Sequence, residues 1–136
     1  MSNTKPIGVA YEDQNIIGAD FLLSDNQFGY TAAAQGSVTQ ATSKSTAVTL
    51  NTSAGQITMN NASLGATTNV TFTLNNSLIS VNDILILNIS GNATAGAYNC
   101  WVSSLAVGSA SITVRNISAS PLSEAVTINY ALIHCA

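Results

Sequence analysis

The chain has 136 residues, of which only 7% are charged and 46% are hydrophobic. Three basic and six acidic side chains give a formal net charge of −3, and no basic cluster is present to neutralise a phosphate backbone, which argues against nucleic-acid binding. At this length one domain can bury a real core without metals or disulfides, and two large domains are excluded.

Uncharged side chains supply most of the polarity, because Ser, Thr and Asn account for 17, 15 and 15 residues. The mean hydropathy of +0.31 argues against a disordered chain. The longest apolar run covers only residues 84–87, so we expect no membrane span. The N-terminus lacks a continuous apolar segment, so we expect no secretory signal peptide and use of the protein without export.

The first 36 residues differ in texture from the rest of the chain. Their apolar residues lack sustained alternation, which predicts an irregular arm over residues 1–36. A loose cation site among the acidic residues of the arm lacks the spacing of a calcium loop. We therefore expect these residues to contact a basic partner surface: Glu12, Asp13, Asp20 and Asp25.

From residue 37 to residue 136 the sequence has the period of two that is typical of half-buried strands. It predicts strands at residues 47–51, 56–60, 69–74, 84–89, 98–103, 110–117 and 125–135. The first two flank a turn at residues 52–55, which predicts a hairpin. The nearly continuous apolar run at 84–89 is typical of a strand covered on both faces, so we expect it to be central in its sheet or to lie between subunits.

This series of short strands, with Thr, Val and Ile enriched and no helical period, predicts an all-β fold. We expect an antiparallel β-sandwich or jelly-roll-like module at residues 37–136, preceded by the arm. No internal sequence repeat stands out, which argues against a solenoid or a propeller.

The chain offers little material for catalysis, and we predict no enzymatic activity and no cofactor. His134 is the only histidine, and no G-x-S-x-G motif accompanies it, so we interpret it as structural rather than as part of a hydrolase triad. By parity it extends an apolar row in the last predicted strand, made of Val126, Ile128, Tyr130 and Leu132. Glycoside hydrolysis needs paired acids, and Asp83 and Glu124 stand alone in the module.

Cys100 and Cys135 are too few and too far apart in sequence for a zinc site, and we predict no metal site. One disulfide stays open as an alternative if their strands are adjacent. Two buried thiols are favoured, because no signal peptide directs the chain to an oxidising compartment.

The predicted strands lack the usual protection of sheet edges. A free β-sandwich guards its edge strands with Lys, Pro or inward charges, yet residues 45–114 contain one charged residue, Asp83. The simplest cover for such edges is another copy of the chain. We therefore predict an obligate homo-oligomer, most simply a homotrimer whose arm extends to a neighbour.

Several segments together resemble a β-rich module that recurs in virion proteins of tailed bacteriophages. They are GSVTQATSKSTAVTLNTSAGQITM at residues 36–59, NVTFTLNNSLISVNDILIL at 69–87, GNATAGAY at 91–98 and SITVRNISASPLSEAVTINYALI at 111–133. The opening KPIGVAYEDQNI at residues 5–16 is similar to short phage structural proteins. The likeness covers most of the chain and is carried by structural motifs, which name no active site.

The resemblance implies a virion component without catalysis, similar to the trimeric modules of tail fibres and head decoration proteins. Because only a short arm precedes the module, a capsid decoration or cement protein is the favoured form. Such a protein is made in the host cytoplasm, binds the major capsid protein on the capsid surface and stabilises the shell, without nucleic-acid or membrane contacts. The alternative is a short tail-fibre tip or receptor-binding adhesin that recognises host glycans through exposed aromatic residues, with candidates Tyr11, Tyr30, Tyr98 and Trp101.

Overall fold

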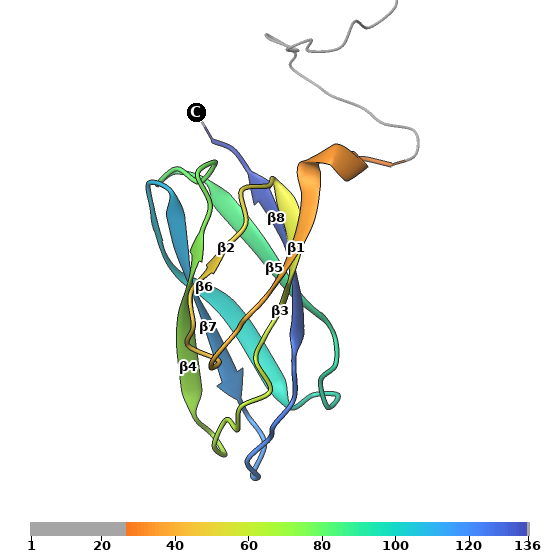
Figure 1. Cartoon of the computed structure of the whole chain (residues 1–136), viewed down its shortest axis with the longest axis vertical. Helices are drawn as coiled ribbons and strands as arrows, with labels where there is room; N and C mark the ends of the chain where they lie inside the picture. The colour runs from red at the N-terminus through yellow and green to blue at the C-terminus, as the bar shows by residue number, and fades with distance from the viewer. Residues whose placement is uncertain (1–26, 136) are drawn as a thin grey trace, which may run out of the picture.

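The computed structural model describes residues 27–135, which form a sandwich of two four-stranded sheets (Figure 1). The strands are β1 (Gln35–Thr39), β2 (Val48–Thr49), β3 (Ala54–Thr58), β4 (Asn69–Asn75), β5 (Ile84–Gly91), β6 (Tyr98–Ala106), β7 (Ser109–Asn116) and β8 (Thr127–Ile133). The one helical element within residues 27–135 is a short 3-10 turn, η1 (Ala32–Ala34). The prediction of an all-β sandwich is confirmed.

The two sheets are mixed rather than wholly antiparallel, which corrects the sequence-based expectation. Sheet A has the order β1-β3-β8-β5, and sheet B has the order β2-β4-β7-β6. The pairs β1–β3 and β2–β4 are parallel, and the other pairs are antiparallel. The parallel pairs follow from the path of the chain, because the first four strands alternate between the sheets. β3 returns to sheet A in the direction of β1, and β4 returns to sheet B in the direction of β2.

The hairpin predicted over residues 47–60 is wrong, because its two strands lie in different sheets. β2 pairs with β4, and the backbone N–H of Leu50 continues this pairing by donating to the carbonyl of Asn75 at 3.0 Å. Residues 50–53 then cross to sheet A, where β3 pairs with β1 and β8. β1 itself was missed, because its first two residues, Gln35 and Gly36, were assigned to the end of the arm.

The core lies between the sheets and consists of the inward-facing side chains of alternate strand residues. In β4 the predicted inward residues Val70, Phe72 and Leu74 all pack into it. In β8 the predicted row is confirmed through Ile128, Tyr130 and Leu132. The row does not extend to His134, because β8 ends at Ile133 and the histidine side chain is exposed. Parity holds only while the chain stays extended.

The apolar strand β5 lies at an edge of sheet A, so the alternative of a central position is wrong. β8 occupies the centre instead, between β3 and β5. Leu85 of β5 is buried, whereas Ile84 and Ile86 on the opposite face are 54% and 50% exposed. The apolar run therefore reflects one face in the core and one face that is open in the single chain.

β1, β3 and Leu50 pack closely around Gly55. A Cβ at this position would lie 2.7 Å from Leu50 Cδ2, 2.9 Å from the backbone oxygen of Gly36 and 3.0 Å from Tyr130 Cε1. We expect Gly55→Ala to lower the free energy of unfolding by about 1–3 kcal/mol, measured by urea denaturation. The matched control is Gly91→Ala, because a Cβ there meets nothing within 4 Å. Equal stability of the two variants would contradict the close packing.

Candidate functional site

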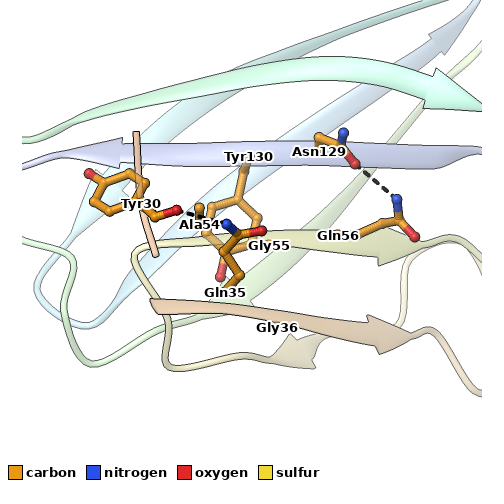
Figure 2. A pocket seen from close by; sticks show the side chains of 8 residues that line it. All are labelled: Tyr30, Gln35, Gly36, Ala54, Gly55, Gln56, Asn129 and Tyr130. Atoms are coloured by element: carbon orange, nitrogen blue, oxygen red, sulfur yellow. Dashed lines mark hydrogen bonds between the residues drawn. The ribbon is translucent and has the colours of Figure 1, made fainter. Parts of the chain in front are cut away.

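A shallow hollow of about 320 Å³ opens on the outer face of sheet A (Figure 2). Its lining includes Tyr30, whose backbone oxygen faces Gln35, and three carboxamide side chains from three adjacent strands, Gln35 of β1, Gln56 of β3 and Asn129 of β8. Apart from the phenol groups of Tyr30 and Tyr130, no residue that lines the hollow is ionisable. The hollow is therefore a neutral site with hydrogen-bonding walls.

The floor of the hollow is formed by the backbone of β1 and β3. Gly36 and Gly55 are register partners in β1 and β3, and both lack side chains because Leu50 fills the space beneath them. Beside them, Ala54 contributes only a methyl group to the outer face. A Cβ on either glycine would point away from the hollow, toward Leu50 on the core side, so the open space between Gln35 and Gln56 depends on the small outward side chain of Ala54.

Hydrogen bonds hold the amides in place. Gln35 Nε2 donates to the backbone oxygen of Tyr30 at 2.9 Å, and Gln56 Nε2 donates to Asn129 Oδ1 at 3.1 Å (Figure 2). Ser90 Oγ also donates to Asn129 Oδ1, at 2.9 Å. In the part of the chain that the structure describes, these bonds leave the oxygens of both glutamines and the amide nitrogen of Asn129 available to a ligand or a neighbour.

A second feature of the same sheet is a cluster of isoleucines toward the β5 edge, which we call the isoleucine patch. It consists of Ile84 and Ile86 on β5 and Ile133 on β8, and each is about half exposed. Ile84 is the register partner of Ile133, and Ile86 is the partner of Ala131. The patch is therefore continuous across two strands.

Asp83 organises a third site, at the entrance to β5. Its side chain is fully buried and accepts hydrogen bonds from the backbone N–H of Ser80 at 2.7 Å and from the Ser80 hydroxyl at 2.8 Å. It also accepts from the backbone N–H of Cys135 at 3.0 Å and contacts His134 Nδ1 at 2.8 Å. Burial alone raises the pKa of Asp83, but these hydrogen bonds outweigh it and hold the pKa well below its usual range.

These residues have the composition of a hydrolase triad but a different geometry. In a triad the histidine accepts the proton of the serine and is oriented by the carboxylate. Here Ser80 Oγ donates directly to Asp83, and the His134 side chain is 64% exposed. The arrangement ties the segment after β8 to the turn before β5, so the ionisable groups act as an anchor of the chain.

Lys44 and Gln40 form a buried polar cluster beside the connection from β1 to β2. Lys44 Nζ donates to the backbone oxygens of Asn60, at 2.6 Å, and of Glu124. Gln40 Nε2 donates to the carbonyls of Lys44 at 3.0 Å and Thr46 at 2.8 Å. Burial lowers the pKa of Lys44, and the nearby charge of Glu124 partly opposes this effect. The ammonium group of Lys44 is therefore used in hydrogen bonds to backbone carbonyls of its own chain.

Glu124 is engaged in the same way. Its carboxylate accepts from the hydroxyl of Thr94 at 2.7 Å and from the backbone N–H of Thr94 at 3.1 Å, and these bonds lower its pKa. The Tyr98 hydroxyl is buried near it, and burial is the main cause that raises the pKa of Tyr98 to about 12, with Glu124 second. Tyr98 is thus a core residue and not the exposed aromatic that the sequence offered as a glycan contact.

The other predicted residues are placed as follows. Cys100 lies on β6 in sheet B and Cys135 follows β8 of sheet A, and both are half-buried free thiols. Burial raises the pKa of the Cys100 thiol. Of the aromatic candidates, Tyr30 and Trp101 are exposed by 40% and 38%. Glu12, Asp13, Asp20 and Asp25 of the acidic arm, together with Tyr11, lie outside the described residues.

No group of three or more His, Cys, Asp or Glu side chains within residues 27–135 could hold a metal ion. No helix in this range is long and apolar enough to cross a membrane.

The residues of the hollow were missed by the sequence reasoning. Gln35, Gln56 and Asn129 are far apart in the chain, and only the parallel pairing of β1 with β3 and the central place of β8 bring them together. The glycines of the two strands mark the close approach of Leu50 on the core side of the sheet, so they gave no signal for the hollow on its outer face.

Comparisons of the chain with protein-family models, with curated proteins and with solved structures found no match.

Asp83 gives the site its pH dependence. Because its pKa is lowered in the folded state, its contribution to stability is complete above the pKa of the unfolded chain, about 4, and is lost as the pH falls further. We expect Asp83→Asn to be less stable at pH 7, since any orientation of the amide turns an NH₂ toward a donor. The difference in urea midpoint from the wild type should shrink between about pH 4 and pH 2. A difference that is constant over this range would contradict the anchor.

Proposed function

We propose that this protein is a non-enzymatic structural component of a phage virion, a capsid decoration protein that binds the outer shell as a homotrimer and stabilises it. The observation that carries the proposal is the outer face of sheet A, which joins the isoleucine patch to uncharged polar side chains along a whole four-stranded sheet. A protein that works by being covered by copies of itself and by a shell needs such a surface.

The use of the ionisable side chains supports the same conclusion. Lys44 binds carbonyls of its own chain, Asp83 anchors the segment after β8, and Glu124 accepts from Thr94. These groups are committed to the folding of the sandwich rather than directed at a common open site. The resemblance of the strand segments to phage virion modules supplies the specific location on the capsid surface, and the major capsid protein as the partner.

A decoration protein binds the assembled shell selectively, so its binding energy is added to the stability of the shell. In this function the acidic residues of the arm, Glu12, Asp13, Asp20 and Asp25, contact the capsid subunits, and the sandwich forms the trimer. Synthesis takes place in the host cytoplasm and the mature location is the virion surface.

The test is the copy number of the chain in purified virions of the phage that encodes it. We expect quantitative mass spectrometry to find hundreds of copies per particle, in a fixed ratio to the major capsid protein. A few copies per particle would contradict decoration and support a tail location. Absence from the particle would contradict a virion role altogether.

A second candidate function, a receptor-binding adhesin, is favoured by the hollow of Figure 2. Neutral saccharides are recognised through hydroxyl groups and through the apolar face of the sugar ring, which suit carboxamides and an aromatic side chain. The hollow presents Gln35, Gln56 and Asn129, and Tyr30 at its border is 40% exposed.

The adhesin candidate predicts binding of neutral saccharides on a glycan array. In that case Gln56→Ala should reduce the signal at least about tenfold, because the hydrogen-bonding wall of a small site is lost. Asn99→Ala is the matched control, since it removes an exposed carboxamide from sheet B instead. An array without signal, or equal loss in both variants, would contradict saccharide binding at this hollow.

A further inference from the structure

The isoleucine patch is the largest group of exposed aliphatic side chains on a strand surface of the sandwich. Ile84, Ile86 and Ile133 point outward from two adjacent strands and are 54%, 50% and 45% exposed. Side chains of this size are seldom left half exposed in a group without a partner, because covering them is favourable by about 25 cal/mol per Å².

The charge of the surroundings indicates which partner fits. Of the strand residues that point outward from sheet A, none is ionisable: Gln35, Ser37, Thr39, Ala54, Gln56, Thr58, Ile84, Ile86, Asn88, Ser90, Thr127, Asn129, Ala131 and Ile133. The whole chain carries a net charge of −3, so two copies repel one another wherever charged surfaces approach. Identical copies that approach at this face avoid that cost, and its strand residues offer no charge to attract a charged partner.

The edge of the sheet adds main-chain hydrogen-bonding groups to the contact. β5 is eight residues long and is an edge strand of sheet A. It contains no Lys, Pro or charged residue between Ile84 and Gly91. Natural sandwiches protect such an edge or pair it with another strand. Its bulge lies at the far end, between Ile89 and Gly91, so the part that carries the patch is regular.

The size of the face is close to what a contact between copies needs. Strands lie about 4.8 Å apart and rise about 3.4 Å per residue, so a four-stranded sheet with strands of this length has a flat area of roughly 400–500 Å² on one face. Side chains that project from the sheet add to this area. Two such faces approach the ~1,000 Å² of buried surface that marks a specific interface.

We propose that the isoleucine patch and the adjoining β5 edge form the contact between copies of this chain, with the patch near the symmetry axis. A residue meets its own equivalent only near such an axis, and there Ile84, Ile86 and Ile133 of each copy are covered by the same residues of the others. The amides of Asn88 and Asn129, which pair across β5 and β8, lie beside the patch and supply hydrogen bonds at its rim. The inference rests on the proposed function only in that the chain works as an assembly of copies.

The first experiment measures the oligomeric state of the full chain by light scattering at micromolar concentration. We expect the wild type to be a trimer and Ile86→Lys to raise the dissociation constant at least about tenfold, because it places a strongly hydrated charge in the covered patch. Val107→Lys is the matched control, since Val107 is 83% exposed in the turn between β6 and β7 and lies outside the patch. Circular dichroism of each variant confirms that the sandwich is folded.

A second variant does not depend on disrupting the assembly. Ile86→Cys should form a disulfide-linked dimer on mild oxidation, because the patch brings residue 86 of one copy close to residue 86 of another. Val107→Cys should not, and the wild type gives the background from Cys100 and Cys135.

The outcomes separate this inference from the proposed function. An oligomer that survives Ile86→Lys and gives no cross-link at residue 86 overturns the patch as the contact and leaves the virion role standing. A wild-type dimer that Ile86→Lys dissociates supports the patch and contradicts the proposed trimer. A monomeric wild type overturns the inference, and saccharide binding at the hollow by that monomer would favour the adhesin.

Discussion

The sandwich depends on satisfying the backbone of its long connections with uncharged side chains. A buried N–H or C=O without a partner costs about 1–3 kcal/mol, so each connection between the sheets needs hydrogen bonds of its own. Asn116 is fully buried and donates to the carbonyls of Leu64 at 3.0 Å and Ser120 at 2.8 Å. Asn76 likewise donates to Thr52 at 2.8 Å and accepts from the N–H of Leu78 at 3.0 Å.

This use of amides explains the composition of the chain. Where other proteins use ion pairs at loop ends, this chain uses Asn, Gln, Ser and Thr, and it reserves Lys44, Asp83 and Glu124 for points where several donors or acceptors converge. The strand faces are then free of charge over a whole sheet. Because uncharged side chains stabilise the connections, the outer face of sheet A is left without charge and is suited to contacts with neutral surfaces.

Local pattern predicted the strands well and the connections between them poorly. Alternation in β4 and β8 identified Phe72, Leu74 and Ile128 as core residues, because strand parity is a local property. The same alternation could not show that residues 52–55 cross between sheets, since a hairpin turn and a crossing use the same small polar residues. Nor could it distinguish a central strand from an edge strand in the apolar run of β5, where Ile84 and Ile86 face outward and Leu85, Leu87 and Ile89 face the core.

The candidate sites were the least predictable part, for a related reason. The hollow requires Gln35, Gln56 and Asn129 to lie on adjacent strands, and the buried anchor requires Asp83 to reach Cys135. Both depend on pairings between distant segments. The sequence pattern placed His134 in the apolar row of the last strand, but β8 ends at Ile133 and the histidine side chain is exposed.

The central place of β8 has a consequence for the order in which the molecule is built during translation. β4, β7 and β6 of sheet B all precede β8 in the chain, so they can pair with one another before β8 is available. Sheet A cannot do so, because β3 and β5 pair with β8 and not with each other. Until residues 127–133 are available, β1 and β3 can pair only with each other and β5 has no partner in its sheet, so their apolar segments stay exposed to other chains. The risk of aggregation is therefore greatest in the interval before β8 pairs with its neighbours.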